Sequence, residues 1–126
     1  MSADGSTVEL TGTGSFMAGP GKSASGSRDY TIAAAGGNVT SSGTWSVVGM
    51  LGFVNYGDGA PQGAPGVNGG QLRLMVSLSN GDTGVLTITC LLGSPPAGMH
   101  EGLTLVLGSG GQFTKSTEGE TAFVPA

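Results

Sequence analysis

The sequence predicts an all-β fold, a single-domain antiparallel β-barrel or β-sandwich of about seven to nine short strands. Alternation of apolar and polar residues dominates the chain, and no run has helical spacing. Turn signals recur about every 8–12 residues. The 26 glycines alternate with β-branched and apolar residues, which favours a tightly curved, closed sheet. At 126 residues the chain fits one domain, 1–126.

The first predicted strand is "TVELTGTGSF", residues 7–16. Val8, Leu10 and Phe16 share one face, and polar residues occupy the other. "MAGPGKSASG" then breaks the alternation, and Pro20 between two glycines indicates a turn.

Strand pattern resumes in "SRDYTIAA", and "AAGGN" predicts a hairpin tip. The following stretch alternates until 47–54, which is apolar on both faces. Such a stretch indicates a strand buried on both sides, or one that crosses from the core to a cavity or an interface. Residues 57–70 are rich in glycine and proline, so we expect a long loop there, of a kind that is often functional or mobile.

The second half of the chain contains the clearest hairpin, "QLRLMVSLS" and "TGVLTITCLLG", turned by Asn80–Asp82. One face of its first strand is predicted to point into the core: Leu72, Leu74, Val76 and Leu78. "SPPAGMHEG" then connects to "LTLVL", "GSGG" predicts another hairpin into "QFTKST", and "ETAFV" predicts a last strand.

Sparse charge argues against several classes of partner. Four Lys and Arg residues face eight Asp and Glu residues, giving a net charge of −4. The cations are scattered, at Lys22, Arg28, Arg73 and Lys115, whereas phosphate backbones and anionic membranes require clustered positive charge. We therefore expect no nucleic-acid partner and no membrane partner.

The remaining global features predict a soluble protein without disulfides. No stretch approaches 18 uninterrupted apolar residues, and "MSADGSTVEL" lacks the pattern of a signal peptide. A cytoplasmic location and secretion with the leader removed both remain open. Cys90 is the only cysteine, and its apolar strand face predicts a small buried hydrophobic residue.

Candidate catalytic residues centre on His100 and Glu101. Histidine changes charge near neutral pH, which suits a general base. Neighbours on an extended segment point to opposite faces, so another group would have to orient the ring. Tyr30 and Asp29 are further acid or base candidates, and an ordinary exposed loop histidine is the alternative. No second histidine or cysteine pair completes a metal site, so we expect none.

Candidate ligand-binding residues are Arg28, Trp45, Tyr56 and Asp58. Arg28 and Tyr30 share a strand face and together offer two donors to a carbonyl or carboxylate. Trp45 is either a core anchor or a ligand platform. Tyr56 and Asp58 lie at the mouth of the expected loop, where an ordinary strand-end turn is the alternative.

Three functions are compatible with this sequence. The first is a β-barrel binding module for a modest organic ligand or a sugar, which forms a homo-oligomer through 47–54. The second is a barrel enzyme of the isomerase or cyclase type that needs no cofactor and uses His100 with Tyr, Asp or Glu as acid and base. The third is a structural or assembly protein.

Overall fold

The computed structural model describes residues 5–17, 23–113 and 123, and the account below concerns these residues. The predicted turn around Pro20, Lys22 and Lys115, and most of the predicted strands 112–117 and 120–124 lie outside them. The elements, in chain order, are β1 (Thr7–Leu10), β2 (Thr13–Met17), β3 (Ser23–Ala33), β4 (Val39–Gly59), the 3₁₀ turn η1 (Ala60–Gln62), β5 (Ala64–Leu78), β6 (Thr83–Cys90), β7 (Gly102–Leu107) and β8 (Gln112–Phe113).

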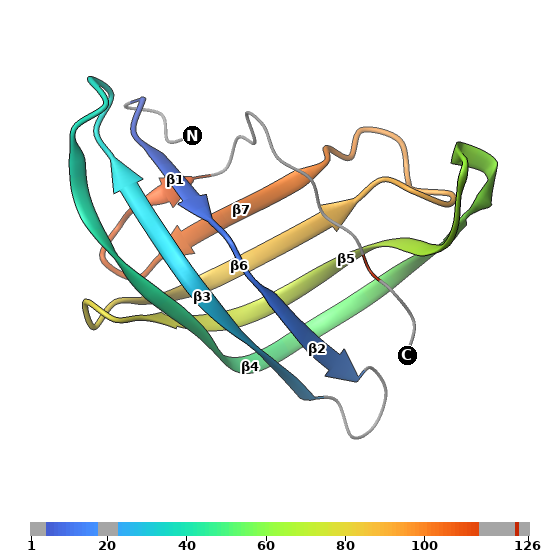
Figure 1. Ribbon diagram of the computed structural model, residues 1–126, viewed down its shortest axis with the longest axis horizontal. Coiled ribbons are helices and arrows are strands. Elements are labelled where there is room, and N and C mark those ends of the chain that lie inside the picture. The colour runs from blue at the N-terminus through green and yellow to red at the C-terminus, as the bar shows by residue number, and fades with distance from the viewer. Residues whose placement is uncertain (1–4, 18–22, 114–122, 124–126) are drawn as a thin grey trace.

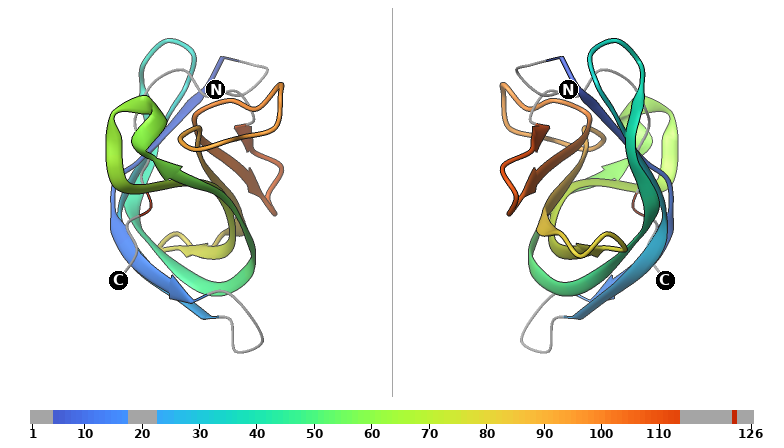
Figure 2. Two further views of the ribbon diagram at one scale, coloured as in Figure 1. Left: turned by 90° about the vertical axis from the view of Figure 1, so that its right-hand side faces the viewer. Right: turned by 90° about the vertical axis from the view of Figure 1, so that its left-hand side faces the viewer.

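These strands form one antiparallel sheet in the order β1-β3-β4-β5-β6-β7-β8, and β2 also pairs with β3. The sheet is nearly closed into a barrel, as the end-on views of Figure 2 show. The long strand β4 makes this curvature, because its first half pairs with β3 and its second half with β5. Strands β1, β2 and β3 therefore cross β5, β6 and β7 at a steep angle (Figure 1). The all-β fold predicted from the sequence is confirmed.

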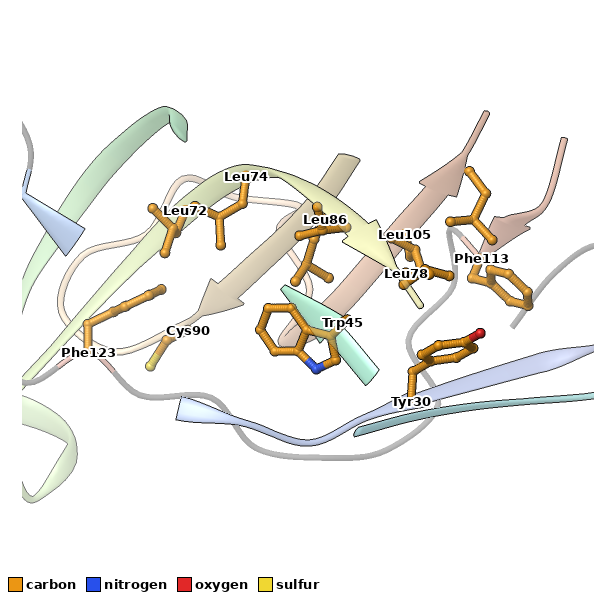
Figure 3. Packing of buried hydrophobic residues seen from close by; sticks show 12 residues of the cluster. Tyr30, Trp45, Leu72, Leu74, Leu78, Leu86, Cys90, Leu105, Phe113 and Phe123 are labelled. Atoms are coloured by element: carbon orange, nitrogen blue, oxygen red, sulfur yellow. The ribbon is translucent and has the colours of Figure 1, made fainter. Parts of the chain in front are cut away.

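The core lies between these two groups of strands. On β5 the predicted alternation is confirmed, since Leu72, Leu74, Val76 and Leu78 are all buried. Figure 3 shows Leu72, Leu74 and Leu78 on the side of β5 that faces Trp45 and Tyr30. The buried cluster consists of Tyr30, Trp45, Leu72, Leu74, Val76, Leu78, Leu86, Cys90, Leu105, Leu107, Phe113 and Phe123. Cys90 is 1% exposed, which confirms its prediction as a buried residue.

Strand β4 departs from simple alternation through repeated β-bulges. Its register with β5 shifts between Val47 and Gly49, between Met50 and Gly52, and twice more toward the tip. Each bulge adds a residue to one strand and turns the following side chains to the other face.

As a result, the inward positions of β4 recur at every third residue. Val47, Met50 and Phe53 pack against the core, whereas Val48, Leu51 and Val54 are exposed. The stretch 47–54 is therefore apolar on both faces without being buried on both. One set of its side chains faces the barrel interior, and the other faces outward.

The expectation of a long loop at 57–70 is wrong. Strands β4 and β5 continue as a paired hairpin as far as Gly59 and Ala64, and only η1 and Gly63 lie between them. The Asp58 carboxylate accepts hydrogen bonds from the backbone N–H groups of Ala60 (2.7 Å) and Gly66 (2.9 Å), which fixes this tip. Glycine and proline form a tight turn and bulges here. The backbone properties of these residues permit such a turn as well as a long loop.

The shorter turns agree with prediction. The Asn80–Asp82 turn joins β5 to β6, and the Asn80 side chain accepts a hydrogen bond from the Asp82 N–H. The "AAGGN" segment joins β3 to β4, and "GSGG" joins β7 to β8. In the part of the chain that the structure describes, no helix has the length and apolar character to span a membrane.

Candidate functional site

The barrel interior contains a cavity of about 580 Å³. Pockets that bury small organic ligands are typically about 300–1,000 Å³ in volume. The cavity is lined by Leu10, Thr11, Gly12, Thr13, Gly14, Ser15, Phe16, Ala24, Ser25, Gly26, Trp45, Val47, Phe53, Asn68, Leu72, Leu74, Leu86, Ile88, Leu103 and Phe123. Residues from seven strands and the bridge residue Phe123 thus line one space, which is partly open to solvent.

The lining is apolar inside and polar at its rim. Aliphatic side chains of β5, β6 and β7 form one wall, and aromatic side chains form much of the other. Exposed residues with hydroxyl groups, Thr13 and Ser15 of β2 and Ser25 of β3, mark the side that reaches solvent. Strand β2 pairs only with β3 among the described strands, so the rim runs beside an unpaired strand edge.

No ionisable side chain lines the cavity among the described residues. A charged group transferred into such a space would lose its hydration without gaining a partner of opposite charge, which is strongly unfavourable. The cavity is therefore suited to an uncharged guest.

Trp45 is the one predicted ligand-binding residue that lines the cavity. Its indole Nε1–H donates to the Thr11 carbonyl at 2.9 Å. The ring also lies close to the backbone at Gly12, where an added Cβ would stand 2.7 Å from Cζ2. These contacts fix the ring, which is 6% exposed. Trp45 is thus both a buried core residue and part of the cavity wall.

Tyr30 and Arg28 do not form the expected pair of donors in the cavity. Tyr30 is 1% exposed, and its hydroxyl hydrogen-bonds to the Ser41 Oγ at 2.9 Å. Arg28 and Asp29 are exposed. Arg28 lies opposite Trp45 in the β3–β4 register, yet none of Arg28, Asp29 and Tyr30 lines the cavity.

His100 and Glu101 lie in the connection between β6 and β7, away from the cavity lining. His100 is exposed. The Glu101 carboxylate accepts a hydrogen bond from the Leu91 backbone N–H at 2.6 Å. That contact ties the end of the connection to its beginning. Glu101 therefore holds this loop closed, and the structure does not bring His100 together with Tyr30 or Asp29 in the cavity.

Tyr56 and Asp58 stabilise the β4–β5 tip. Tyr56 is buried, and its carbonyl accepts a hydrogen bond from Ser94 at 2.7 Å. The side-chain amide of Gln62 also donates to the Gly93 carbonyl at 2.9 Å and accepts from the Gly93 N–H at 3.1 Å. The tip and the Pro-Pro connection are thus joined through the Tyr56 carbonyl and the Gln62 side chain. Neither Tyr56 nor Asp58 lines the cavity.

Apart from Trp45, the aromatic residues of the cavity are three phenylalanines that were not among the predicted site residues. Phe16, Phe53 and Phe123 line it together. The inward face of the first predicted strand already included Phe16. A three-residue spacing of Val47, Met50 and Phe53 identifies Phe53 once the bulges are known, but no local signal places Phe123 beside them.

No group of three or more His, Cys, Asp or Glu suited to a metal ion occurs among the described residues.

On the outer surface, Val48, Leu51 and Val54 of β4 are exposed, as is Met75, which lies opposite Gly49. Val48, Leu51 and Val54 belong to the stretch 47–54 that was expected to form an interface, whereas Met75 lies on β5. Self-association stays a prediction.

Comparison with known proteins gives no relative from which a function can be transferred. No protein-family model, curated protein or solved structure matches the chain at a significant level.

Proposed function

We propose that this protein is a small β-barrel binding module that takes up an uncharged, largely apolar organic molecule in its interior. The observation that carries the proposal is the cavity of about 580 Å³, whose described lining contains apolar side chains and no ionisable one. Apolar surface transferred from water into such a space stabilises a complex in proportion to the area buried.

The lining also supports binding over catalysis as the proposal. An acid–base enzyme needs a group within hydrogen-bonding reach of the proton that it moves. His100, Glu101, Tyr30 and Asp29 do not line the cavity. Binding without chemical change therefore fits the arrangement better than the isomerase or cyclase alternative.

The test is a titration with Nile red, an uncharged dye that becomes more fluorescent in apolar surroundings. Trp45 is the only tryptophan and lines the cavity, so a bound dye must also quench its emission. We expect saturable dye fluorescence and Trp45 quenching with the same midpoint.

A matched pair of variants localises the dye. Ala24 lines the cavity, whereas Ala33 of the same strand does not. An added side chain in a filled space costs about 1–3 kcal/mol, so Ala24→Leu should weaken dye binding about tenfold. Ala33→Leu should leave dye binding unchanged. Equal affinities for both variants, or no saturable binding by the parent protein, would overturn the proposal.

A further inference from the structure

We propose that the molecule bound in the barrel carries an aromatic ring, which packs beside a three-phenylalanine cluster formed by Phe16, Phe53 and Phe123. This inference rests on the proposed binding function and adds the chemical class of the ligand. It follows from how these rings are arranged, how much of them stays accessible and how they are held.

The rings of the three-phenylalanine cluster contact one another at angles that favour aromatic neighbours. The centroid of Phe16 lies 4.7 Å from that of Phe53 and 5.8 Å from that of Phe123, and Phe53 and Phe123 are 5.1 Å apart. Their interplanar angles are 52°, 86° and 71°. Tilted and edge-to-face pairs at such distances bring the positive edge of one ring to the negative face of another. A further ring can extend this pattern, whereas a saturated ring has no such quadrupole.

The cluster keeps accessible surface where a ligand would lie. Phe16 and Phe53 are only partly buried, although both side chains pack against the core and line the cavity. Phe123 is 8% exposed and is the most buried of the three. The indole of Trp45 lies on the same cavity.

The cluster is also held in place before any ligand arrives. A Cβ at Gly70 would stand 2.6 Å from the Cε1 and Cζ atoms of Phe53, so the Phe53 ring packs on bare backbone. The main chain at Phe123 is held by a hydrogen bond, in which its carbonyl accepts from the Asn68 N–H at 2.7 Å. Rings that are already ordered lose little conformational entropy on binding, which favours affinity for a guest of matching shape.

The test compares two competitors with one carbon skeleton and one hydroxyl group. 2-Naphthol and decahydro-2-naphthol are both uncharged at pH 7, and only the first is aromatic. We expect 2-naphthol to displace Nile red at about fivefold lower concentration, the size of one or two aromatic contacts. Phe53→Leu should bring this ratio close to one. Ile88→Val, which trims the aliphatic wall, should leave the ratio as in the parent protein.

The outcomes separate this inference from the proposed function. If Nile red binds in the cavity but the two competitors displace it equally, or if a folded Phe53→Leu protein keeps the ratio, the aromatic inference fails and the binding function stands. If Nile red itself does not bind in the cavity, the proposed function fails. Should Phe53→Leu not fold, Phe16→Leu is measured in its place, with the same two expectations.

Discussion

At the scale of single residues, several strand glycines matter because they lack a side chain. Gly69 of β5 is an example, because a Cβ added there would overlap the backbone carbonyl of Leu92. Its φ lies outside the left-handed region, so its role is close approach of two backbones. This contact lets the connection after β6 lie against the β4–β5 tip.

Replacement of Gly69 therefore has a specific expected cost. Gly69→Ala should lower the free energy of unfolding by about 1–3 kcal/mol, because overlap with a backbone atom forces a main-chain shift. Gly36→Ala is the control: its added Cβ meets nothing within 4 Å, so we expect a change within about 0.5 kcal/mol. Urea denaturation of both variants measures the difference, and similar stabilities would contradict the close approach.

At the scale of elements, β4 decides what the barrel interior contains. Its bulges convert the sequence "VVGMLGFVN" into repeats of three residues, in which the first faces inward and the second outward. A straight strand would place Val47, Leu51 and Phe53 on one face and Met50 on the other. The bulges instead keep Met50 and Phe53 together inside.

This arrangement gives opposite expectations for two neighbouring residues. Met50→Ser should lower the free energy of unfolding by about 2 kcal/mol, because an apolar side chain leaves the core. Leu51→Ser should change it by less than about 0.5 kcal/mol, because Leu51 is exposed. Thermal or urea denaturation distinguishes them. A larger effect at Leu51 would mean that the strand alternates without bulges.

At the scale of the whole molecule, the sheet is nearly closed into a barrel, and the described strands β3 to β7 each pair with the next strand in the sequence. Cys90 reports on this closure because it ends β6 and lies in the core, 1% exposed. A thiol reagent can reach it only when the sheet opens, so its reaction rate measures that opening.

We therefore expect the Cys90 thiol to react with a water-soluble aromatic disulfide on the order of a hundredfold more slowly in the native protein than in urea. Saturating Nile red should slow the native reaction further, because a ligand that binds only the closed barrel stabilises it. The control is a Thr44→Cys, Cys90→Ala protein, whose exposed thiol should react rapidly under both conditions. Rapid native reaction of Cys90 would contradict its burial.

Local patterns predicted those parts of this fold that depend on neighbours in the chain. Alternation on β5 placed Leu72 and Leu74 correctly, and the Asn80–Asp82 turn followed from residues that favour it. The same reasoning failed at 57–70, where glycine and proline were compatible with both a long loop and a bulged hairpin. Only pairing with the partner strand selects the hairpin there.

The candidate site itself was decided by tertiary structure. His100 and Glu101 drew attention because their chemistry is visible in isolation, yet the structure uses Glu101 to bind the Leu91 N–H and leaves His100 exposed. The cavity instead depends on residues as far apart as Phe16 and Phe123. The sequence by itself determined an antiparallel β fold with few charges, because strand alternation and turn preference are local properties. The site was set only by the tertiary structure, because an internal cavity is the space left when side chains from distant strands pack around one another.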